Sequence, residues 1–188
     1  MNRRWLSRLP AAIAVAGVLM LSQGGWIYLK ARLAQVLLHR AWAKTLAGEK
    51  AVKPWPWADT WPIARLTVPA AGVDQIVLAG ASGRTLAFGP GHLDGSARPG
   101  RGGNCVLSAH RDTQFRFLRD LSPGDEIRLQ AADGKTAVYR VDARRIIDKA
   151  STGVLKPTAG RTLTLLTCYP FDAVVPGGRL RYVVRARG

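Results

Sequence analysis

The spacing of apolar residues changes twice along the chain. Residues 11–29 are almost continuously apolar, whereas residues 28–50 carry apolar side chains at the spacing of one helix face. This second pattern predicts a helix that ends at Gly48. After Pro62 the apolar residues occur in short runs separated by Gly, Pro and Asp, which is typical of strands and turns. The helix-face positions are Leu29, Leu33, Val36, Leu37 and Ala41.

Eight short runs after Pro62 are candidate strands, and a separate segment, "DTQFRFLRDL", has the pattern of a short helix. Asp133 and Gly134 form a tight-hairpin sequence between the fifth and sixth runs. Many short strands with turn signals predict an all-β fold, either a small closed barrel or a sandwich. The eight runs are "ARLTVP", "DQIVLAG", "RTLAFGP", "GNCVLSAH", "DEIRLQAA", "TAVYRVDARRII", "RTLTLLTC" and "RLRYVVRA".

The N-terminal apolar segment, residues 11–29, has about the twenty residues that a helix needs to cross a bilayer. A cleaved signal peptide is the competing interpretation, although no small-x-small cleavage site follows the apolar core. Arg3, Arg4 and Arg8 precede the segment, and the positive-inside rule leaves them in the cytoplasm. We therefore expect an uncleaved transmembrane signal anchor in residues 1–30, with the rest of the chain outside the cytoplasm.

A tryptophan- and proline-rich stretch, "KPWPWADTWP", separates the helical part from the strands. Prolines at this density exclude a helix and favour an extended linker. Its three tryptophans have three possible uses, which are packing on the domain, lying at a membrane interface and gripping a partner. We expect three parts: residues 1–30 as the anchor, 31–62 as an amphipathic helix and linker, and 63–188 as the β domain.

The net charge of +16, from 28 Lys and Arg against 12 Asp and Glu, suits an anionic partner. The basic residues are scattered, without a run of five or six and without interleaved aromatic residues. This distribution argues against a nucleic-acid-binding protein, and we expect an anionic membrane surface as the counterpart.

The cysteines and histidines are few, so their positions are informative. Along "GNCVLSAH" the alternation of a strand places Cys105 and His110 on opposite faces. Cys105 is therefore expected to be a small core residue, and a Cys105–Cys168 disulfide is the alternative in an oxidising compartment. No Cys and His have metal-ligand spacing, so we expect no metal and no cofactor.

His110 and Cys168 each stand at the end of a candidate strand, where a rigid element gives way to a loop. Arg179, Arg181 and Arg185 lie at alternate positions near the C-terminus and share one strand face. An arginine beside a thiol and an imidazole suits an anion or a charge that develops during a reaction. A solvated sheet edge is the alternative for each arginine.

Three motifs resemble those of one family. "TLTLLTCYPF" resembles the threonine-hydrophobic-threonine-cysteine signature of sortases, "LSAHRDTQF" the histidine motif of their class D-like members, and "RLRYVVRA" their arginine-bearing last strand. The similarity covers about residues 63–188. It implies a closed sortase-type β-barrel of about eight strands with short helices, preceded by a transmembrane helix. "PWPWADTWP" and Cys-Tyr-Pro-Phe are similar to a proteobacterial, Gram-negative branch, which implies a single-pass inner-membrane protein with a periplasmic catalytic domain.

The resemblance also implies a reaction. Sortases are cysteine transpeptidases that cleave the C-terminal sorting signal of a secreted or surface protein and pass it to an amine acceptor. Cys168 matches the nucleophile that forms the thioacyl enzyme, and His110 matches the general acid and base. Arg181 matches the arginine that donates hydrogen bonds to the substrate carbonyl or the developing oxyanion.

The substrate-contacting residues are less sharply determined by sequence. Periodicity does not choose between Arg179 and Arg181, but the run Arg-Tyr-Val-Val-Arg matches the family best at Arg181. We expect Thr167, Tyr169 and Arg179 to contact substrate. Two other functions stay open: a thiol peptidase of the hydrolase class, in which water resolves the thioester, and a non-catalytic peptide-binding barrel with Cys168 buried.

Overall fold

The computed structural model describes residues 9–175 and 177–188, and most side chains of residues 9–28 lie outside the described set. The chain forms two compact units, residues 1–36 and residues 37–188. The second unit holds all the strands and every candidate site residue.

The first helix, α2 (Leu9–Leu46), runs through the boundary between the two units. In the second unit its last turns place Leu38 and Trp42 against Ile76 and Leu78, in an apolar cluster separate from the barrel core. The predicted helix is confirmed, and it ends two residues before Gly48, whose φ of 99° suits glycine.

The expected membrane-spanning segment, residues 11–29, has the backbone of α2, but most of its side chains are not among the described residues. Among the described residues, no helix is both long and apolar enough to cross a membrane.

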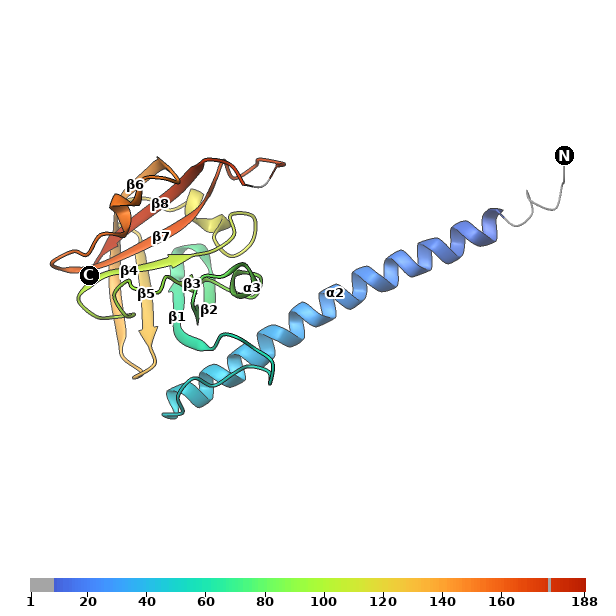
Figure 1. The fold of residues 1–188 in the computed structure, drawn as a ribbon, viewed down its shortest axis with the longest axis horizontal. Helices are drawn as coiled ribbons and strands as arrows, with labels where there is room; N and C mark the ends of the chain where they lie inside the picture. Colours follow the sequence, from blue (N-terminus) through green and yellow to red (C-terminus); the bar gives the residue numbers. More distant parts are fainter. Residues whose placement is uncertain (1–8, 176) are drawn as a thin grey trace. The chain divides into compact units, whose positions relative to one another are not determined.

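The second unit is a closed barrel, as the sequence predicts (Figure 1). In the described chain the eight strands follow the order β1-β2-β3-β4-β7-β8-β6-β5 around it. Two neighbouring pairs, β2–β3 and β4–β7, are parallel, and the other pairs are antiparallel. The strands are β1 (Pro62–Val68), β2 (Val73–Ala79), β3 (Gly91–His92), β4 (Gly103–Ser108), β5 (Glu126–Ala131), β6 (Thr136–Asp148), β7 (Arg161–Tyr169) and β8 (Leu180–Arg187).

One predicted strand, "RTLAFGP", is wrong. The segment begins in the short helix α3 (Gly83–Leu86), because the Ser82 side chain accepts a hydrogen bond from the Thr85 amide and caps the first turn. The neighbouring strand β3 begins just after this segment, at Gly91. A Cβ at Gly91 would lie 2.3 Å from the Gly80 carbonyl oxygen, so this approach of two backbones requires glycine.

The other local predictions agree with the structure. "DTQFRFLRDL" contains the 3-10 helix η2 (Arg116–Arg119), and the predicted hairpin turn joins β5 to β6 with Gly134 at a φ of 78°. Two further 3-10 turns, η1 (Pro69–Ala71) and η3 (Thr152–Leu155), lie in loops.

The barrel interior is filled by alternate residues of its strands. In the parallel pair β4–β7, Cys105 lies opposite Leu163 and Leu107 opposite Leu165, and all four side chains are fully buried. Cys105 is therefore a core residue, as predicted, and burial raises the pKa of its thiol to about 12. Both cysteines are free thiols, so the alternative of a disulfide is wrong.

The tryptophan-rich linker has no regular secondary structure, in agreement with its prolines. Trp55 packs edge-on against Phe88 with ring centroids 4.7 Å apart, whereas Trp57 is 83% exposed. Packing on the domain thus accounts for Trp55 but not for Trp57.

Candidate active site

Strand register places a thiol and a guanidinium side by side. Cys168, the second-last residue of β7, is the direct cross-strand partner of Arg181 in β8. Opposed residues of an antiparallel pair project from the same face, with Cβ atoms about 4.5–5.5 Å apart. Arg181, rather than Arg179, is therefore the arginine that the register places next to Cys168.

His110 reaches the same face from the other side of β7. The parallel pairing of β4 and β7 ends at Ser108 opposite Leu166, and the Ala109 amide still donates to the Leu166 carbonyl over 3.3 Å. Alternation then turns His110 outward, as it turns Cys168 outward in β7. His110 is exposed and Cys168 is half-buried, so the thiol is within reach of a substrate.

A buried hydroxyl strengthens this junction between the strands. Thr167 donates a hydrogen bond of 2.7 Å from its Oγ1 to the carbonyl of Ala109, the residue before His110. Thr167 and Ala109 both point inward and are almost fully buried. The residues just before the thiol and just before the imidazole are thus joined directly, which limits the movement of one relative to the other.

Arg181 is half-buried, and its hydrogen bonds go to backbone carbonyls. Its Nη1 donates to the carbonyls of Gly178 and Leu180, at 2.7 and 2.8 Å. An arginine has five N–H donors in a planar fork, so it can hold these carbonyls while presenting other donors to a further oxygen. A thiol, an imidazole and a guanidinium on one exposed face can perform acyl transfer through a thioester.

Comparison with known proteins decides the family. The family model of the sortase domain matches residues 66–188 of the chain. The chain belongs to the sortase family. It is 33% identical over 120 residues to sortase D of Bacillus subtilis strain 168, a match that covers 63% of this chain and 60% of that relative, which supports a class D-like member.

Solved structures agree with the family. The chain is similar to sortase A from Corynebacterium diphtheriae, with a TM-score of 0.62 and 32% identity over 70% of this chain and 62% of that one. It also shares the fold of a sortase D5 transpeptidase of Clostridium perfringens, with a TM-score of 0.65 and 24% identity over 83% of this chain and 98% of that one. The prediction of a sortase-type barrel is confirmed.

The three residues expected to contact substrate do not gather beside Cys168 in this sortase domain. Thr167 has its side chain inside the barrel, where it holds Ala109. Tyr169 lies in an aromatic cluster with Phe171 and Tyr182, at centroid distances of 6.2 and 6.1 Å. Arg179 forms an exposed ion pair of 3.1 Å with Asp148 at the end of β6. For Thr167 the alternation explains the difference, since neighbours of an outward cysteine must point inward.

A cavity lies on the outer face of the sortase barrel, on the strand face that carries the thiol. This cavity of about 310 Å³ lies between the sheet and the β6–β7 loop, and Thr162 and Thr164 of β7 line it. These threonines share the strand face of Cys168 by alternation, so the cavity opens on the same side of β7 as the thiol. Asn104 holds the loop over the sheet, because its Nδ2 donates to the carbonyls of Val154 and Lys156, at 2.8 and 3.1 Å.

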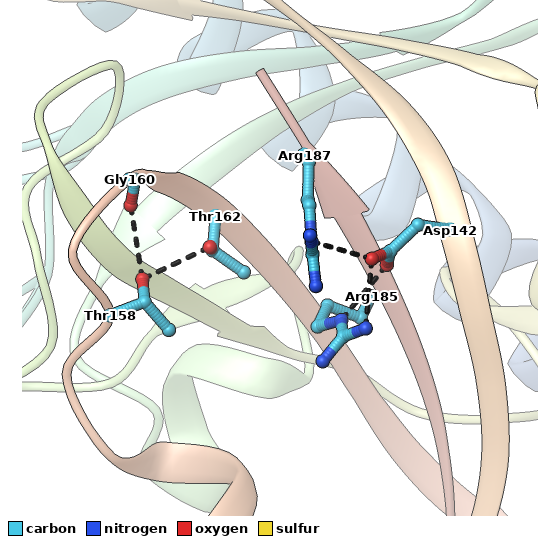
Figure 2. A network of polar contacts seen from close by, with 6 residues as sticks. All are labelled: Asp142, Thr158, Gly160, Thr162, Arg185 and Arg187. Atoms are coloured by element: carbon cyan, nitrogen blue, oxygen red, sulfur yellow. Dashed lines mark hydrogen bonds and ion pairs between the residues drawn. The ribbon is translucent and has the colours of Figure 1, made fainter.

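The remaining arginines of the last strand are held away from the thiol. Asp142, at an irregularity in β6, accepts hydrogen bonds of 2.9 and 2.8 Å from Arg185 and forms an ion pair of 2.7 Å with Arg187 (Figure 2). The hydrogen bonds from Arg185 are the largest cause of a lowered Asp142 pKa. Thr158 donates to the Gly160 carbonyl and to Thr162, both at 3.0 Å, and so fixes the loop end nearby (Figure 2).

Sequence reasoning missed two residues that shape this site. Asn104 is a buried amide in the strand that carries Cys105, and an amide inside an apolar run signals a specific hydrogen-bonding role. Arg111 follows His110 and is buried, which its polar sequence context did not indicate. Among the described residues there is no cluster of three or more His, Cys, Asp and Glu side chains that could hold a metal ion.

Proposed function

We propose that this chain is a cysteine transpeptidase that cleaves the C-terminal sorting signal of a secreted or surface protein and transfers it to an amine acceptor. One observation carries the proposal: Cys168 and Arg181 are cross-strand partners, and His110 follows the strand on the other side of Cys168. Membership of the sortase family, whose members are cysteine transpeptidases, supports it. The chain spans 60% of the length of the B. subtilis relative, and its substrates are inferred from chemistry.

The first half of the reaction forms a thioester. The Cys168 thiolate attacks the carbonyl carbon of the scissile peptide bond, and the electron pair of the carbonyl moves to oxygen. Arg181 donates hydrogen bonds to this oxyanion. The oxyanion collapses, the C–N bond breaks, and the imidazolium of His110 gives its proton to the departing amine.

The second half repeats these steps in reverse with a new amine. The neutral amine attacks the thioester carbonyl, His110 accepts its proton, and the C–S bond breaks to release the Cys168 thiolate. The half-buried setting of Cys168 suits this sequence, because it leaves the thioester accessible to an amine. Water in place of the amine would give hydrolysis, which is the second candidate function.

The test is incubation of the purified protein with a sorting-signal peptide, with and without an amine, followed by mass spectrometry. Transpeptidation predicts an amine-joined product that replaces the free acid as the amine concentration rises. Free acid at every amine concentration would assign a hydrolase. No cleavage and no labelling of Cys168 by a thiol-reactive probe would leave a non-catalytic peptide-binding barrel.

We further infer a proteobacterial branch and an inner-membrane location, with the catalytic domain in the periplasm. The support is sequence alone: the arginines before residues 11–29, and "PWPWADTWP" beside Cys-Tyr-Pro-Phe. An exposed Trp57 and the net charge of +16 suit a nearby anionic membrane surface. A reporter fused after Gly188 should be active only if it folds outside the cytoplasm; a reporter that works in the cytoplasm would reverse this topology.

A further inference from the structure

Arg111 is the residue directly after His110, and it is only 9% exposed. Arginine is rarely buried unless it is paired, because a charge removed from water loses its hydration. The reaction as proposed above gives Arg111 no part. Its burial beside the general acid and base therefore needs an explanation.

The partners of Arg111 lie in the loop between β7 and β8, residues 170–179. Its Nη2 donates to the carbonyl of Ala173 over 2.6 Å and to the carbonyl of Val175 over 3.4 Å. These are hydrogen bonds from a charged donor, which are stronger than those between neutral groups. The contact joins the segment that carries His110 to the loop that starts just after Cys168.

The two ends of this loop are fixed by other groups. Phe171 packs against Tyr182 with ring centroids 5.1 Å apart, and the Gly178 carbonyl accepts from Arg181. Among the described residues in the middle of the loop there is no such apolar anchor, since Val174 and Val175 are 97% and 74% exposed. The described contact that holds the middle of the loop to the barrel is therefore the guanidinium of Arg111.

Strand pairing does not extend to His110 itself. The β4–β7 ladder ends at Ser108, and the bonds of Ala109 to Leu166 and Thr167 are the last across this junction. His110 then enters a loop with an exposed side chain. Two described contacts hold the chain after Ala109: the Phe115 amide donates to the His110 carbonyl over 2.9 Å, and the next residue, Arg111, donates to the Ala173 carbonyl. The first fixes the backbone of His110, and the second ties this backbone to the loop that follows Cys168.

We propose that Arg111 is a positioning residue, which fixes His110 relative to Cys168 by holding the β7–β8 loop through the Ala173 carbonyl. The proposal rests on the proposed function. A displacement of about 1 Å in a reacting group can cost about 100-fold in rate. Because both halves of the reaction pass a proton through His110, release of Arg111 lowers kcat, whereas peptide contacts elsewhere on the outer face are unaffected.

The test compares Arg111→Gln and Arg111→Lys with the matched control Arg116→Gln, a substitution of an exposed arginine at the start of η2. We expect Arg111→Gln to lower kcat by about 100-fold with KM for the peptide changed by less than about threefold. Arg111→Lys keeps one charged donor and should recover part of the loss. Arg116→Gln should match the wild type. Unfolding curves establish that each variant is folded, and if Arg111→Gln is not, the Arg111→Lys variant decides.

A second measurement needs no peptide substrate. The rate of Cys168 alkylation by iodoacetamide is measured as a function of pH. It follows the fraction of thiolate, which depends on the position of the neighbouring imidazole. We expect Arg111→Gln to change the shape of this profile and Arg116→Gln to preserve it. A kcat within about twofold of wild type, or a loss confined to KM, would overturn the role of Arg111 while the function stands. A wild type without any transfer would instead refute the function, and the alkylation profile would then decide the positioning role.

Discussion

The interior of the barrel and its outer rim use the same strands for opposite purposes. Cys105 and Cys168 lie on the neighbouring strands β4 and β7, yet Cys105 is fully buried and Cys168 is half-buried opposite Arg181. Burial raises the pKa of Cys105 to about 12 and makes it an inert core residue. Both positions hold a cysteine, so the residue type does not explain the difference in expected reactivity. What differs is whether the side chain points into or out of the barrel, and whether the residue lies at the end of its strand.

The largest expected effect separates the two thiols. Cys168→Ala should abolish transpeptidation while the barrel stays folded, because a rim residue leaves little cavity on truncation. Cys105→Ala should keep substantial activity and lower the free energy of unfolding by about 1 kcal/mol. Product formation and urea unfolding of both variants measure this contrast. A folded Cys105→Ala protein as inactive as Cys168→Ala would remove the distinction between interior and rim.

His110→Ala tests the second outward residue at the ends of β4 and β7. We expect a folded protein without measurable transfer to the amine, because both proton transfers pass through His110. Activity is measured with the same peptide, and near-ultraviolet circular dichroism checks the fold. Full activity in this variant would contradict the assigned role.

The next effect distinguishes two arginines that sequence periodicity could not separate. Arg181→Lys should lower the acylation rate by roughly 100- to 1000-fold, because lysine lacks the planar fork of donors. Arg179→Lys should change it little, since Arg179 forms an exposed ion pair with Asp148. Single-turnover acylation with one peptide compares them. Equal mild losses would deny the role to both, and the reverse order would move it to Arg179.

A smaller, twofold effect is expected in the number of thiols that a reagent can modify. At pH 8 we expect iodoacetamide to modify one thiol per native chain and two per chain unfolded in urea, because Cys105 is fully buried with a raised pKa. Intact-mass spectrometry counts the adducts, and Cys168→Ala serves as the control that should take none in the native state. Two adducts on the native protein would mean that the interior is open to the reagent.

The smallest effect concerns the ion pairs of the outer face. The Asp142 pKa is lowered, first by the Arg185 hydrogen bonds, so its contribution to stability is present above the unfolded pKa of about 3.9 and is lost as pH falls. Asp142→Asn should therefore lower the free energy of unfolding at pH 7 by at most about 1 kcal/mol, and less in acid.

Urea unfolding at pH 7 and pH 3 measures this difference. Asp120→Asn is the matched control, because Asp120 is more exposed and its contact with Arg119 is 3.5 Å long. A difference between wild type and Asp142→Asn that grows in acid would contradict the linkage.

The period-2 pattern was the most informative part of the sequence. It predicted Cys105 inside and His110 outside, and the turn residues at Asp133 and Gly134 predicted the β5–β6 hairpin. It failed for "RTLAFGP", where a side-chain cap at Ser82 and a close approach at Gly91 override the apolar run.

What the sequence could not supply was the relation between distant segments. Arg181 was chosen over Arg179 by family resemblance, and the reason became visible only in the register with Cys168. The partners of Arg111 are backbone carbonyls more than sixty residues away. Every residue has a backbone carbonyl, so the sequence does not indicate which of them accepts a hydrogen bond. Roles that depend on backbone acceptors are for this reason invisible before the fold is known.

Closure of the barrel determines how a peptide can be recognised. Every strand in the described sheet has neighbours on both sides, although β3 pairs with only two residues each of β2 and β4. Little free edge therefore remains to which an extended peptide could add as a further strand. A peptide substrate of the proposed reaction would lie across the outer face, beside Cys168, where most backbone groups of the strands are already paired. Recognition then comes from a few side chains and pockets along that face, which favours a short linear motif and tolerance of the sequence on either side of it.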